Sequence, residues 1–179
     1  MSEKEKYTIL WGRPEGYGNN YDIPKGKEVI NFIVDELYLV GDESILDIGG
    51  GDGRLKKFFE GHAYTSLDIA PNAGADIVAD ITTWKNPGAY DVGMCCDVME
   101  HIPPESVTNA INNIAHTCSR AAFMISTRPD RFGAKIGMSL HLTVRPPRWW
   151  SKELHRVWDD VRLVRDIPND YCIFTCENL

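Results

Sequence analysis

A glycine-rich turn that follows an acidic residue is the part of the sequence best suited to chemistry. In the segment Ser44-Ile-Leu-Asp-Ile-Gly-Gly-Gly-Asp-Gly-Arg-Leu55, a short apolar run ends at Asp47 and Ile48, and glycines follow at positions 49, 51 and 53. A strand, a glycine turn and a helix in this order expose backbone N–H groups to a ligand of nucleotide type. The segment therefore predicts a site for a cofactor that contains a nucleoside.

The spacing of the glycines separates the classes of nucleotide site. A dinucleotide fingerprint that starts at Gly49 needs a third glycine at position 54, where this chain has Arg54. A P-loop ends in Gly-Lys-Ser/Thr, which is absent from the sequence. The pattern formed by Asp47, Gly49, Gly51 and Gly53 instead resembles the first motif of class I S-adenosylmethionine-dependent methyltransferases. In that family the acid at position 47 fixes the turn and lies near the amino group of the cofactor, and a turn-organising role alone fits equally well.

Two acids further along the chain extend this resemblance. Asp68 follows Asp47 by 21 residues and ends a second apolar run, where a carboxylate accepts hydrogen bonds from ribose hydroxyls. Proteins that bind NAD use the same acid, and a simple turn carboxylate is the alternative. The resemblance adds Ile69 to the cofactor site. It also implies that Asp80 accepts from the adenine amino group and that Ile81 contacts the ring, whereas the alternative role of Asp80 is to cap the turn at 82–83.

The run from Tyr90 to Ile102 resembles the family's buried strand followed by Glu-His. The resemblance implies that Cys96, Asp97 and Val98 line the adenosine and methionine portions of the cofactor. Glu100 is expected to have a structural role. His101 either holds the loop by hydrogen bonds or faces the methyl acceptor.

Methyl transfer from a sulfonium requires alignment of the acceptor, exclusion of water and, for a hydroxyl, removal of a proton. Histidine suits the last task. His141 lies after the fifth predicted strand, where this fold builds its acceptor pocket, so His141 and His101 are the predicted catalytic residues. Alternatively, His141 has a structural role, with its ring hydrogen-bonded within a loop or an extra strand. The other histidines, at 62, 116 and 155, are predicted at the surface or at helix ends.

The segment 128–150 contains further groups that fit an acceptor. Its arginines at 128, 131, 145 and 148 suit an anionic acceptor, although a solvated surface is the plainer interpretation. Trp149 and Trp150 could stack on a planar or sugar acceptor, but Trp150, Leu154 and Trp158 also form a helical stripe typical of a core. No metal site is predicted, because the sequence lacks H-E-x-x-H and zinc-spaced Cys/His sets.

The elements that must position these residues alternate along the chain. Residues 1–26 predict an irregular N-terminal arm, 27–39 an amphipathic helix, and 53–60 and the stretch after Pro104 two more helices. Apolar runs predict strands at 44–48, 64–68, 75–81, 90–96 and 121–126, and a final hairpin at 161–165 and 171–175. The expected fold is α/β, a mostly parallel seven-stranded sheet with helices on both faces and a C-terminal antiparallel hairpin. Residues 1–179 are predicted to form one methyltransferase domain.

The amino-acid composition limits the classes of partner that this chain is expected to bind. The net charge of −7 disfavours nucleic acid, and no apolar run approaches the length of a membrane span. Five cysteines without a C-x-x-C pair indicate reduced, buried thiols and a cytoplasmic location. We expect S-adenosylmethionine as cofactor, S-adenosylhomocysteine as product, and transfer to an oxygen or nitrogen of a small molecule, anionic or a sugar. The alternatives are a protein or RNA acceptor, a non-catalytic cofactor-binding subunit, and a nicotinamide dehydrogenase.

Overall fold

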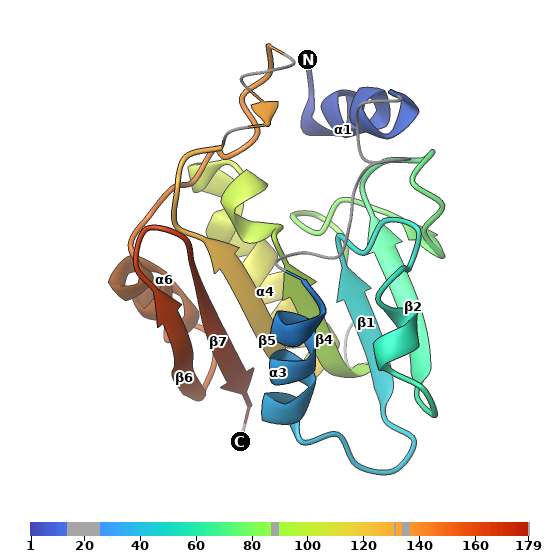
Figure 1. Cartoon of the computed structure of the whole chain (residues 1–179), viewed down its shortest axis with the longest axis vertical. Helices are drawn as coiled ribbons and strands as arrows, with labels where there is room; N and C mark the ends of the chain where they lie inside the picture. Colours follow the sequence, from blue (N-terminus) through green and yellow to red (C-terminus); the bar gives the residue numbers. More distant parts are fainter. Residues whose placement is uncertain (14–25, 87–89, 131, 134–136, 179) are drawn as a thin grey trace.

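A seven-stranded sheet forms the centre of the computed structural model, which describes residues 1–13, 26–86, 90–130, 132–133 and 137–178 (Figure 1). Its strand order is β3-β2-β1-β4-β5-β7-β6. The first five strands in that order run parallel, and β7 is antiparallel to both of its neighbours. The strands are β1 (Ser44–Ile48), β2 (Ala63–Asp68), β3 (Ile77–Val78), β4 (Tyr90–Cys96), β5 (Cys118–Ser126), β6 (Asp160–Ile167) and β7 (Tyr171–Glu177). The predicted fold class is confirmed.

Helices cover both faces of this sheet because buried side chains alternate along its strands. Ile45, Met94 and Ala122 pack on the face that α3 covers, whereas their neighbours Leu46 and Cys95 pack on the face that carries α4 and α6. The helices are α1 (Glu3–Gly12), α3 (Lys27–Leu37), α4 (Val107–Thr117) and α6 (Pro147–Leu154), with 3-10 turns η1 (Lys56–Phe58), η2 (Met99–His101) and η3 (Pro104–Ser106). Among the described residues, no helix is both long and apolar enough to span a membrane.

The aromatic stripe of α6 belongs to the core. Trp150 and Leu154 are fully buried, and Trp158, just beyond the helix, is almost fully buried. Trp149 is only partly buried and packs against Trp150 with their ring planes nearly perpendicular. The core interpretation of the stripe is therefore confirmed, and Trp150 has no surface left for an acceptor.

The predicted irregular arm at 1–26 is wrong for its first half, because residues 3–12 form α1. A capping box starts this helix: the Ser2 hydroxyl accepts from the Glu5 amide, and the Glu5 carboxylate accepts from the Ser2 amide. The helix has almost no apolar stripe, since only Lys6 and Leu10 are buried, and periodicity therefore gave no signal. Residues 14–25 of the predicted arm lie outside the described residues.

Two other predicted elements are shorter in the structure. Within 53–60 only η1 is helical, because Gly53 and Gly61 both have left-handed backbones and the intervening residues hydrogen-bond at three-residue steps. The apolar side chains of this stretch, such as Phe59, are nevertheless buried. Within 75–81 only two residues pair with β2, because the Asp76 side chain accepts hydrogen bonds from Ser66 instead.

The parallel strands bring their carboxyl ends to one edge of the sheet. The glycine loop after β1, the segment after β3 and the turns η2 and η3 after β4 all lie at that edge, and α1 lies across it (Figure 1). In an open α/β sheet this edge is where ligands bind.

Candidate functional site

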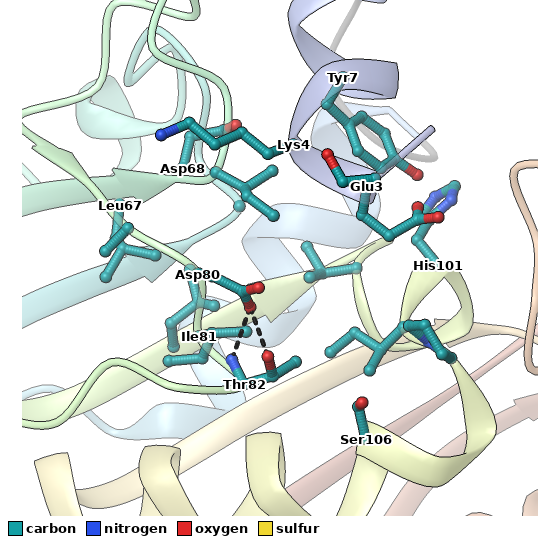
Figure 2. Close-up of a pocket in the computed structure, with 18 of the residues that line it drawn as sticks. Glu3, Lys4, Tyr7, Leu67, Asp68, Asp80, Ile81, Thr82, His101 and Ser106 are labelled. Atoms are coloured by element: carbon teal, nitrogen blue, oxygen red, sulfur yellow. Dashed lines mark hydrogen bonds between the residues drawn. The ribbon is translucent and has the colours of Figure 1, made fainter.

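A cavity of about 280 Å³ opens at the carboxyl edge of the sheet (Figure 2). Its walls come from the glycine loop, the ends of β2 and β4, the turn after β3, η2 and the first turns of α1. Elements far apart in the sequence thus meet around one space.

The glycine loop adopts a backbone that side chains would obstruct. Gly49 has a φ of 72°, its N–H donates to the Leu67 carbonyl at 2.7 Å, and a Cβ added there would overlap Val98. Gly51 has a φ of 54°, and a Cβ there would overlap the Trp11 ring. Glycine is therefore required at both positions for conformation and for space.

Asp47 is buried beneath this loop. Its carboxylate accepts a hydrogen bond from the Tyr64 hydroxyl and packs against Gly50. Burial, opposed by the Tyr64 hydrogen bond and aided by the charge of Asp68, raises the pKa of Asp47 to about 7. With Cys96 it lines a smaller hollow beside the loop rather than the main cavity. These contacts match the turn-organising role.

Asp68 faces the cavity from the end of β2. Its two carboxylate oxygens accept from the Gly51 amide at 3.1 Å and from the Ala70 amide at 2.9 Å. Burial raises the pKa of Asp68, and these backbone hydrogen bonds lower it. Ile69 lines the cavity next to it. The acid is thus held rigidly, with its position fixed by the glycine loop.

Asp80 and Ile81 also line the cavity. One oxygen of Asp80, Oδ1, accepts from the amide and the hydroxyl of Thr82 at 2.9 and 2.7 Å (Figure 2). The turn-capping alternative for Asp80 is therefore realised in the structure, and the same residue still forms part of the cavity wall.

The turn after β4 supplies the opposite wall. Asp97 and Val98 line the cavity, and Asp97 has a left-handed φ of 51° while its amide donates to the Met124 carbonyl. Glu100 is fully buried: its Oε1 accepts from the Ser126 amide at 3.1 Å, and its carbonyl accepts from the amides of residues 142 and 143. Burial and the nearby charge of Asp97 raise the pKa of Glu100.

The two predicted catalytic histidines lie against each other. Their ring centroids are 4.9 Å apart and the ring planes are nearly perpendicular. His101 lines the cavity and its Nδ1 lies 3.0 Å from the Leu140 carbonyl, whereas His141 lies behind it with Nδ1 2.8 Å from the Arg128 carbonyl. Burial, followed by the neighbouring His141, lowers the pKa of His101 to about 3, so His101 is neutral at pH 7.

Helix α1 contributes cavity residues that no sequence pattern indicated. Glu3 and Tyr7 lie on the side of the cavity near His101 (Figure 2), and the Tyr7 and His101 rings are perpendicular with centroids 5.8 Å apart. Lys6 forms an ion pair with Glu3 within the helix, and its 3.0 Å hydrogen bond to the Ser139 carbonyl attaches the helix to the rest of the protein. The spacing Ser2-x-x-Glu5, a capping box, was the available signal for this helix.

The arginines of the 128–150 segment lie elsewhere. Arg128 pairs with Asp170 at 2.9 Å, and Arg145 lies over the Trp149 ring. Neither they nor Arg148 lines the cavity, and Arg131 is outside the described residues. The described arginines thus give no anion-binding cluster at the cavity.

Solved structures resemble this chain over nearly its whole length. The Haemonchus contortus phosphoethanolamine N-methyltransferase 2 in complex with S-adenosyl-L-methionine matches with a TM-score of 0.72 and 12% identity, over 99% of this chain and 60% of that one. The Burkholderia thailandensis 1,6-didemethyltoxoflavin-N1-methyltransferase, with bound 1,6-didemethyltoxoflavin and S-adenosylhomocysteine, gives 0.66 and 14%, over 99% and 91%. The fold is that of class I S-adenosylmethionine-dependent methyltransferases.

The methyltransferase fold is shared without close sequence similarity. The N-methyltransferase NodS from Bradyrhizobium japonicum, in complex with S-adenosyl-L-homocysteine, matches with a TM-score of 0.65 and 13% identity, over 98% of this chain and 97% of that one. No protein-family model matches the sequence, and no curated protein sequence matches it. This chain spans about three fifths of the length of the Haemonchus enzyme.

Proposed function

We propose that this protein binds S-adenosylmethionine and transfers its methyl group to an oxygen or nitrogen atom of a small molecule. One observation carries the proposal: the glycine loop, Asp68 and the Asp80–Ile81 pair, which are 12 or more residues apart in the sequence, converge on a single cavity at the ligand-binding edge of a methyltransferase fold. The structures that share this fold include proteins crystallised with S-adenosylmethionine or S-adenosylhomocysteine.

Each wall of the cavity suits one part of the cofactor. Asp68, fixed by two backbone amides, would accept hydrogen bonds from the ribose hydroxyls. Asp80 would accept from the adenine amino group while Ile81 packs on the ring, and the glycine loop lets the backbone approach the rest of the cofactor. The positive sulfonium supplies a methyl group ready for in-line displacement, so the protein needs no nucleophile of its own.

The acceptor end lies where α1 meets η2. Glu3, Tyr7 and His101 surround it, and the neutral His101 ring would hydrogen-bond an O–H or N–H group of the acceptor (Figure 2). His141 lies behind His101 and would position it rather than touch the acceptor directly. Because α1 lies across the edge, it excludes water and favours a small acceptor over a docked protein or RNA. The Burkholderia structure, with bound 1,6-didemethyltoxoflavin, agrees with a small acceptor.

The ribose assignment is tested by titrating S-adenosylhomocysteine into Asp68→Ala by calorimetry. Loss of a charge-assisted hydrogen bond of about 1.5–3 kcal/mol predicts binding weaker by roughly 10- to 100-fold. Asp166→Ala is the matched control, because Asp166 is exposed on the edge strand β6, at the other end of the sheet. Equal affinity in the two variants, both folded by circular dichroism, would contradict the assignment.

A further inference from the structure

Two histidines and a buried glutamate gather behind the acceptor end of the cavity. Glu100 and His101 belong to η2, and His141 comes from the segment that packs onto it. One ligand atom from each of the three lies within 4.8 Å of the others. The cluster lies next to the cavity wall, because His101 belongs to both.

Both rings are held in the same tautomer. The Nδ1 atoms of His101 and His141 lie 3.0 and 2.8 Å from the backbone carbonyls of residues 140 and 128. A carbonyl oxygen only accepts, so in each neutral ring Nδ1 carries the proton and Nε2 keeps a free lone pair. Histidines that ligate metals are oriented in this way, with the non-ligating nitrogen donating to a carbonyl or carboxylate.

The Glu100 carboxyl group is the third potential ligand of the cluster. Its Oε1 accepts from the Ser126 amide, but its Oε2 is enclosed and has no amide or hydroxyl donor among the described residues. The group beside it is a second acid, Asp97. The side chains of these two acids hydrogen-bond to each other, so they share a proton, and a cation bound by Glu100 and the two imidazole lone pairs would displace it.

We propose that Glu100, His101 and His141 bind one divalent transition-metal ion. Two imidazole nitrogens and one carboxylate oxygen suit zinc or manganese better than magnesium, which prefers oxygen ligands throughout. Donors around a tetrahedral zinc are separated by roughly 3.4 Å, given zinc–nitrogen bonds of about 2.1 Å. The ligand atoms lie within 4.8 Å of one another, so their separations would contract by up to about 1.4 Å on binding.

Three protein ligands leave a fourth position open, as in catalytic zinc sites. Because His101 also lines the cavity, an acceptor oxygen there would complete the coordination, and this bond would replace the direct hydrogen bond between the acceptor and His101. A metal ion lowers the pKa of an oxygen that it binds and so removes the need for a strongly basic side chain. This part rests on the proposed function and favours a hydroxyl as the methylated group. The metal site itself does not depend on it.

The site is tested by calorimetric titration of chelator-treated, dialysed protein with ZnCl₂ and, separately, MnCl₂, with no cofactor present. We expect one ion per chain for at least one metal. His141→Ala should weaken that binding by more than about 10-fold, the smallest loss expected when a metal site is disturbed. The matched control is His116→Ala, since His116 is an exposed histidine on α4.

Glu100→Gln is the second variant, because it keeps an oxygen for the Ser126 amide while removing the charge. Circular dichroism serves as the control that each variant is folded. Absence of stoichiometric binding by the unaltered protein would overturn the proposal, as would equal binding by His141→Ala and His116→Ala. Titration of the same preparation with S-adenosylhomocysteine separates this outcome from failure of the proposed function, because cofactor binding without metal binding contradicts the metal site alone.

Discussion

The buried carboxyl group of Asp47 makes the stability of the fold depend on pH. This group is buried between the Tyr64 hydroxyl and Gly50, and the nearest charge is the like charge of Asp68. Burial raises its pKa to about 7 from an ordinary value near 3.8. The folded protein therefore binds this proton more tightly than the unfolded chain does.

The sign of the pH effect follows from this difference. Below about pH 4 both states are protonated at Asp47, and between about pH 4 and 7 only the folded state keeps the proton, so the contribution of Asp47 to stability falls as pH rises through this window. Asp47→Asn keeps an acceptor for Tyr64 and does not titrate. We predict that the variant gains stability relative to the unaltered protein as the pH rises from 4 to 7, by about a few kcal/mol in the free energy of unfolding. Thermal unfolding of both proteins at each pH measures this as a growing difference between their midpoints. A difference that stays constant across this range would contradict the raised pKa.

At the scale of elements, α1 is the segment whose placement matters most for the cavity. Leu10 is fully buried and attaches the helix to the body of the protein, whereas its neighbour Ile9 is 38% exposed. Leu10→Ala should destabilise the protein by about 2–5 kcal/mol and release α1, and Ile9→Ala should have little effect. Amide hydrogen exchange over residues 3–12 measures the release, and faster S-adenosylhomocysteine dissociation should accompany it. Equal protection of these amides in both variants would show that α1 is held by other contacts.

Elements with strong apolar patterns were predictable from the sequence. The runs that form β1, β4, β5 and β7 are almost continuously buried on both faces, so their type followed from burial alone. Helix α1 was missed because it lies on the surface of the fold with only two buried side chains. The predicted helix at 53–60 was wrong because apolar residues in tight turns between two left-handed glycines reach the core equally well.

The two ends of the proposed site also differ in how far the sequence predicted them. The residues proposed for the cofactor were predictable as one group because Gly49, Asp68 and Asp80 each lie at or just after the carboxyl end of a strand, and parallel strands bring these ends together. The acceptor end was not, since Tyr7, His101 and His141 come from segments whose relative positions depend on tertiary packing. His141 follows His101 by 40 residues, a separation that no local metal motif has, and for this reason the sequence predicted no metal site.

At the scale of the whole molecule, the reactivity of the five cysteine thiols measures global unfolding. All five, at positions 95, 96, 118, 172 and 176, are buried and unpaired, and burial raises the pKa of every one of these thiols. We predict that a thiol-reactive disulfide reagent at pH 8 labels less than one cysteine per chain in the native protein over several minutes. In denaturant it should label all five at once. Fast labelling of one or more thiols in the native protein would contradict this uniform burial.

We infer that this cavity binds S-adenosylmethionine. The inference is supported by the methyltransferase fold, the glycine loop and the two acids at the strand ends. Calorimetric titration of the unaltered protein with S-adenosylhomocysteine and, in a separate experiment, with NADH tests that claim most directly. We predict one-to-one binding of S-adenosylhomocysteine and no binding of NADH, because Arg54 stands where a dinucleotide site needs glycine. Binding of NADH alone, or of neither ligand, would contradict the account.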